Sequence, residues 1–199
     1  MLFRSLVIEK FVREGVPVSM RSMGKESTRE MLQEYVDHLL ALVDLSSIRK
    51  LKVVIDAGNG MAGHTAPAVF QRINADVTEM YFELDGTFPN HEANPIDEEN
   101  LTDLKQMVRK RKADIGLAFD GDADRCFLVD EKGNAVNPSL LTALIADREL
   151  VKRPNSSIIY NLISSRAVRE IIEERGGTAI RSRVGHSFIK AMMAESGAI

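Results

Sequence analysis

The sequence is poor in cysteine: it has one in 199 residues, so no disulfide can form within the chain. Small domains in oxidising compartments are commonly stabilised by disulfides, so this composition favours a reducing compartment, and we expect a cytoplasmic protein. The single cysteine, Cys126, lies in an apolar run. We expect it to be a small buried side chain rather than a reactive thiol.

The sequence also lacks an excess of basic residues and any long apolar run. Its 26 lysines and arginines are outnumbered by 29 aspartates and glutamates, and the formal net charge is −3. Without a basic surface, nucleic acid is not expected as a partner. The apolar runs are far shorter than the about 20 residues that a membrane span requires. The first fifteen residues contain acidic residues, and their apolar residues have helical spacing, unlike a signal peptide, so no membrane association is expected.

An acidic segment between two short apolar runs is the most informative feature. Residues 115–129 read IGLAFDGDADRCFLV. The apolar runs predict buried strands, which places Asp120, Asp122 and Asp124 on the loop that joins them. Because residues two apart on an extended loop project to the same side, the three carboxylates can converge. Ionised carboxylates about 3 Å apart at an effective dielectric of about 20 repel by about 5 kcal/mol. This favours a hard divalent cation such as Mg²⁺.

Two alternatives apply to this segment. Counted from Asp120, positions one, three and five are aspartate and position twelve is Glu131, as in an EF-hand calcium loop. Position six is Arg125, where an EF-hand requires glycine, and residues 127–129 favour a strand rather than a loop. In the second alternative the aspartates only form a solvated hairpin turn. Three carboxylates and an arginine exceed what a turn needs.

Alternating strands and amphipathic helices predict an α/β fold. A strand at 52–55, a DAGNG turn at 56–60 and a helix at about 62–72 resemble the first half of a βαβ unit. The turn could cradle phosphate, although it is not GxGxxG and lacks a Walker lysine; an ordinary tight turn is the alternative. A strand at 76–82 and a helix at 97–112 follow, and the basic residues that end this helix suit its dipole.

The long loop between that strand and that helix spans residues 84–95. It contains His91 among Asn, Glu and Pro residues. We interpret this histidine as solvated surface.

Helices are also predicted at both ends of the chain. An apolar face at residues 2–12 predicts a first helix, a polar linker spans 16–27, and a second helix spans 28–43. Beyond residue 135 we expect a helix capped by Ser139, a strand, a helix capped by Ser164 or Ser165, a strand and a final helix. This last unit looks unfinished.

The string DGDADR at residues 120–125 resembles the metal-binding loop of the α-D-phosphohexomutases, the phosphomannomutase and phosphoglucomutase family. The resemblance implies three-layer α/β/α domains with mixed β-sheets, one complete and one truncated. Residues 1–27 would be the remnant of a preceding domain plus a linker. Residues 28–134 would be the second domain with its metal loop, and residues 135–199 part of the third.

The resemblance also implies roles for individual residues. The three aspartates would bind Mg²⁺, and Arg125 would hold the serine loop or the transferring phosphate. The segment RVGHS at 183–187 is similar to a third-domain turn whose histidine reaches the substrate. His186 is therefore expected to be a catalytic and substrate-binding residue, with Arg183 as a further phosphate contact.

The implied activity is that of an isomerase that moves phosphate between the 1 and 6 positions of mannose or glucose phosphate through a phosphoserine. The sequence departs from the family in three places: no serine has a THNP-like or SHNP-like context, the sugar-gripping loop is absent, and Ile163 stands where many relatives have lysine, with Arg166 nearby. We therefore expect this chain alone to be inactive, with the first and fourth domains as partners. The alternative is a non-catalytic metal- or phosphosugar-binding module, or one piece of a split enzyme.

Overall fold

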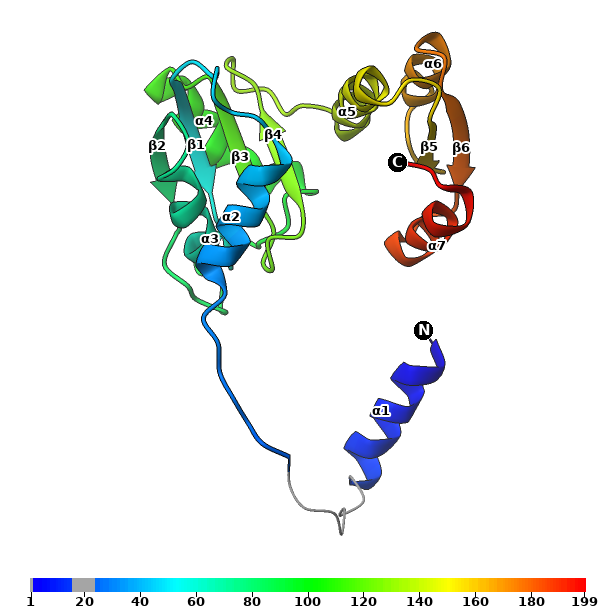
Figure 1. Cartoon of the computed structure of the whole chain (residues 1–199). Helices are drawn as coiled ribbons and strands as arrows, with labels where there is room; N and C mark the ends of the chain where they lie inside the picture. The colour runs from blue at the N-terminus through cyan, green and yellow to red at the C-terminus, as the bar shows by residue number, and fades with distance from the viewer. Residues whose placement is uncertain (1, 16–23) are drawn as a thin grey trace. The chain divides into compact units, whose positions relative to one another are not determined.

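A computed structural model describes residues 2–15 and 24–199 of the protein (Figure 1). The chain separates into two compact units, Met1–Met31 and Leu32–Ile199. The first unit contains α1 (Leu2–Glu14), as predicted; residues 16–23 of the predicted linker lie outside the described residues. The second unit begins with α2 (Leu32–Leu42), which starts four residues later than predicted.

A mixed four-stranded sheet forms the first half of the second unit. Its strands are β1 (Leu51–Asp56), β2 (Ala75–Met80), β3 (Ile115–Phe119) and β4 (Cys126–Val129), in the order β2-β1-β3-β4. β1 is parallel to β2 and β3, whereas β3 and β4 form an antiparallel pair. The carboxyl ends of the three parallel strands therefore meet at one edge of the sheet.

Helices cover both faces of this sheet (Figure 1). Successive strand residues point to opposite faces, which separates the core into two layers. Val54 packs with Leu104 and Val108 of α4 (Thr102–Arg111), which the 3₁₀ helix η1 (Glu98–Leu101) precedes. Val53 and Ile55 pack with Ala66 of α3 (Ala62–Phe70). The resulting three-layer α/β/α arrangement confirms the predicted fold class.

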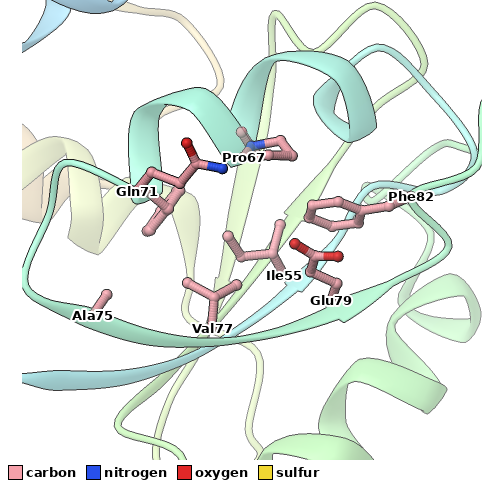
Figure 2. Close-up of a pocket in the computed structure, with 9 residues that line it drawn as sticks. Ile55, Pro67, Gln71, Ala75, Val77, Glu79 and Phe82 are labelled. Atoms are coloured by element: carbon pink, nitrogen blue, oxygen red, sulfur yellow. The ribbon is translucent and has the colours of Figure 1, made fainter.

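A small cavity lies between α3 and the sheet, beside the edge strand β2. Its volume is about 200 Å³. Figure 2 shows Pro67 of α3 and Gln71, the residue after α3, on one side of it, with Ile55 and Val77 of the sheet opposite. Glu79 and Phe82 also line it.

The second half of this unit contains α5 (Pro138–Lys152), β5 (Ser157–Asn161), α6 (Arg166–Glu174), β6 (Thr178–Ser182) and α7 (His186–Ser196). β5 and β6 form a parallel two-stranded sheet, and α5 and α6 pack against each other through a core that includes Leu150 and Ile172. Within the described residues, no helix is both long enough and apolar enough to cross a membrane.

The caps of these helices partly match the predictions. Ser165 caps α6 as predicted, since its side chain accepts from the Ala167 amide. The predicted Ser139 cap of α5 is wrong. Asn137 is the cap, and its side chain accepts from the Ser139 amide at 2.8 Å. Pro138 can occupy the first helical position because an amide donor is not needed there, so the cap lies two residues before the predicted Ser139.

Substitution of the fully buried Leu104 would test how α4 packs on the sheet. A Cβ added to Gly116 of β3 would lie 3.0 Å from Leu104 Cδ1, so the leucine fills the space above that strand. Leu104→Ala should lower the free energy of unfolding of this domain by about 2–5 kcal/mol. Native-state hydrogen exchange of β1 and β3 amides would measure the loss. The matched variant Leu84→Ala, at a side chain that is 53% exposed, should change it by less than about 0.5 kcal/mol. If both variants lost the same free energy of unfolding, this description of the packing would be wrong.

Candidate functional site

The three aspartates of residues 120–125, called here the acidic loop, converge. Asp120, Asp122 and Asp124 each offer one carboxylate oxygen, and these oxygens lie within 4.8 Å of one another. Asp120 is buried, with 1% of its surface exposed, and the other two are exposed. A donor set made only of oxygen suits a hard cation such as Mg²⁺. The chemistry of the loop therefore fits the cation that the sequence predicted.

Arg125 holds Asp120 in place from within the same loop. The Arg125 amide donates to Asp120 Oδ1 at 3.0 Å, and its Nε donates to Oδ2 at 2.5 Å. Burial opposes ionisation of Asp120, but the hydrogen bonds from Arg125 outweigh it and lower the pKa of that carboxyl. Arg125 Nε also lies 3.5 Å from Asp124 Oδ1. Asp120 is consequently an ionised, oriented acceptor at neutral pH.

The turn after β1 touches the acidic loop directly. The Met61 amide donates to the Gly121 carbonyl at 3.0 Å. A Cβ added to Gly60 would lie only 2.6 Å from that carbonyl oxygen, so position 60 has no room for a side chain. The glycine that ends the DAGNG turn is therefore required by this contact.

His91 is placed differently from the prediction. It was expected on the solvated surface, but its side chain is 16% exposed and its Nε2 lies 3.0 Å from Oδ2 of the buried Asp56. The hydrogen bond to Asp56 raises the pKa of His91 to about 9, against the opposing effect of burial. Sequence reasoning missed this pair because the two residues are 35 positions apart and share no local motif.

Several non-glycine residues in the loops at this edge of the sheet have a left-handed backbone conformation. Asn59, Tyr81, Phe88 and Ala123 all have positive φ between 50° and 60°. Non-glycine residues rarely adopt this conformation, and where they do the surrounding contacts must hold them. For Asn59 those contacts are side-chain hydrogen bonds to the Glu83 carbonyl and from Asn90, both at 2.8 Å.

His186 and the acidic loop line the same cavity. This cavity has a volume of about 630 Å³ and is lined by Asp122, Asp124, Arg125, His186 and Lys190. His186 is the first residue of α7, and Lys190 follows it by four residues, which places both side chains on one helix face. Lys190 was not singled out from the sequence, although its spacing from His186 was a usable signal.

Among the described residues that line this cavity, neither the predicted Arg183 nor Ile163 and Arg166, named from the sequence at the position of a family lysine, is found. Arg183 stacks its guanidinium on Phe188, with Cζ 3.1 Å from the ring centroid. Ile163 is 75% exposed, and Arg166 forms a salt bridge with Glu170 at 2.7 Å.

The prediction that Cys126 is buried is wrong. Cys126 begins β4 and is exposed. The run Cys126 to Val129 is buried fully only at its far end, because β4 is the last strand in the sheet order.

Comparison with known proteins matches two family descriptions to the chain. Residues 33–133 match "Phosphoglucomutase/phosphomannomutase, alpha/beta/alpha domain II". Residues 137–199 match the corresponding domain III.

Among curated relatives, a phosphoglucomutase of Neisseria meningitidis serogroup A is 38% identical over 182 residues, which is 92% of this chain and 39% of the relative. A phosphomannomutase/phosphoglucomutase of Pseudomonas putida is 39% identical over 178 residues, 89% of this chain and 38% of the relative. The chain thus spans about two fifths of the length of the curated relatives that it matches.

The fold has close counterparts among solved structures. A phosphoglucomutase/phosphomannomutase family protein from Burkholderia thailandensis superposes with a TM-score of 0.87 at 32% identity, covering 96% of this chain and 41% of that one. The two domain matches together extend from residue 33 to the last residue of the chain. The chain therefore belongs to the phosphoglucomutase/phosphomannomutase family.

Proposed function

We propose that this chain is part of an isomerase that transfers phosphate between the 1 and 6 positions of a hexose phosphate, mannose or glucose. One observation carries the proposal: three carboxylate oxygens from a single loop lie within 4.8 Å of one another at the edge where the parallel strands end. Ligands of open α/β sheets bind at this edge. The names of the relatives, phosphoglucomutase and phosphomannomutase, support the substrate class.

Asp120, Asp122 and Asp124 would hold Mg²⁺. The ion, when bound, would draw negative charge from the phosphoryl oxygens. The crowding of three acidic oxygens supports this assignment, because their mutual repulsion falls when a positive charge lies among them.

The other cavity residues would bind phosphate and sugar. Arg125 has five N–H donors, and its described contacts to Asp120 and Asp124 both use Nε, so its terminal nitrogens would bind phosphoryl oxygens. His186 would donate or accept a proton at a sugar hydroxyl. Lys190, one helical turn further along α7, would place an ammonium group beside the same phosphate. Arg183 would add a contact from just before α7.

The phosphate donor would be a phosphoserine on a domain that this sequence does not include. Its P–O bond would break as the sugar hydroxyl oxygen attacks in line, and the hydroxyl proton would pass to a base. In this proposal residues 1–27 belong to a preceding domain and linker, residues 28–134 form the second domain and residues 135–199 form part of the third. The first and fourth domains would complete the site, within one chain or in trans.

The metal assignment predicts that Asp122→Asn weakens Mn²⁺ binding, with Mn²⁺ used as a probe for Mg²⁺. Removal of one of three charged ligands should lower the affinity by about tenfold or more. Isothermal titration calorimetry on the whole chain would measure it. Glu131→Gln is the matched control, because Glu131 is exposed and would be a ligand only in an EF-hand. A loss in the control as large as that in Asp122→Asn would favour the calcium-loop alternative.

The domain assignment predicts that the chain alone does not interconvert hexose phosphates. A coupled assay of mannose 1-phosphate to mannose 6-phosphate conversion should give the background rate, because the phosphoserine is missing. The longer Pseudomonas putida relative serves as the positive control, and adding the missing domains should restore turnover. Robust turnover by this chain alone would refute the proposal that the phosphoserine lies on another domain.

A further inference from the structure

We propose that His91 is a positioning residue for the acidic loop. It fastens the loop of residues 84–95, called here the 84–95 loop, to the end of β1. The 84–95 loop in turn lies beside Gly121 and limits how far the acidic loop can move from its cation-binding arrangement. This inference rests on the proposed function, which assigns the cation to the acidic loop.

His91 and the buried Asp56 form a partly buried ion pair, and every polar side-chain atom of the pair has a hydrogen-bond partner. His91 Nδ1 lies 2.9 Å from the Glu92 carbonyl oxygen, which can only accept, so Nδ1 carries a proton. Nε2 lies 3.0 Å from the Asp56 carboxylate, so it is a donor as well, and the ring is an imidazolium. The other Asp56 oxygen accepts from the Gly58 amide at 2.9 Å. Each Asp56 carboxylate oxygen therefore accepts a hydrogen bond, one from the turn after β1 and the other from the 84–95 loop.

The 84–95 loop lies beside Gly121 of the acidic loop, at the distance where an added Cβ on that glycine would make ordinary van der Waals contacts. Ala93, two residues after His91, has its Cβ 3.3 Å from the position of a Cβ on Gly58 and 3.8 Å from one on Gly121. The Phe88 ring lies 3.4 Å from the same position on Gly121. Since Gly121 separates the first two aspartates of the acidic loop, displacement of the 84–95 loop would leave that segment unsupported on one side.

A second attachment of the same loop supports this interpretation. Asn90 donates to the side-chain oxygen of Asn59 at 2.8 Å, and the Asp85 amide donates to the Asn59 carbonyl at 3.0 Å. The β1 turn thus binds the 84–95 loop on one side and, through Met61 and Gly60, the Gly121 carbonyl on the other. Asp56 and Asn59 are buried polar residues, and these hydrogen bonds compensate the cost of removing their side chains from water.

The test measures Mn²⁺ affinity of the whole chain by electron paramagnetic resonance, together with hydrogen exchange of residues 120–125. His91→Ala should weaken Mn²⁺ binding by about tenfold, the lower range for residues that orient metal ligands. It should also speed amide exchange in the acidic loop while β1 and β3 stay protected, which a general loss of stability would not do. His38→Ala, at an exposed histidine on α2, should change neither measurement.

The outcomes separate this inference from the proposed function. If Asp124→Asn weakens Mn²⁺ binding and His91→Ala leaves both affinity and acidic-loop exchange unchanged, the positioning role is wrong and the metal site stands. If Asp124→Asn binds Mn²⁺ like the parent chain, the cation lies elsewhere and both proposals fail. If His91→Ala does not fold, Asn90→Ala at an exposed position replaces it. The same loss of affinity is expected there, and an unchanged affinity would overturn the inference.

Discussion

The backbone contact between the turn after β1 and the acidic loop is the constraint on which the site depends. The Met61 amide and the Gly121 carbonyl meet at 3.0 Å, and the approach at Gly60 leaves no space for a Cβ. Parallel pairing makes the contact possible, because β1 and β3 are neighbours and both end at this edge. Three aspartates on a free loop would spread apart by repulsion. On a loop fixed by a neighbouring turn their carboxylate oxygens stay close together, as the proposed cation site requires.

Basic side chains from two parts of the sequence lie around the three aspartates. Arg125 lies within the loop and pairs with Asp120, which keeps the buried carboxylate ionised. His186 and Lys190 come from α7, some sixty residues later in the sequence, and line the same cavity as Asp122 and Asp124. In the proposed function, a cation bound by the aspartates and the basic side chains of α7 would together surround a phosphate group, as phosphoryl transfer requires.

The sequence predicts features that depend on neighbouring residues. The acidic loop was predictable because two short apolar runs and three aspartates at a spacing of two encode strand, loop and strand locally. The helix cap at Ser164 or Ser165, found at Ser165, follows from an equally local rule. Cys126 was misjudged because its apolar run does not reveal that β4 is the last strand of the sheet. His91 was misjudged because its partner Asp56 belongs to a different strand end, and only the folded topology brings the two together.

A diffraction experiment on crystals of the chain soaked in Mn²⁺ tests the central claim most directly. The account predicts one strong anomalous peak within coordination distance of carboxylate oxygens from Asp120, Asp122 and Asp124, with the Gly121 carbonyl still bound to the Met61 amide. An acidic loop without a peak and with its carboxylates apart, at a Mn²⁺ concentration that fills other acidic sites on the protein, would contradict it.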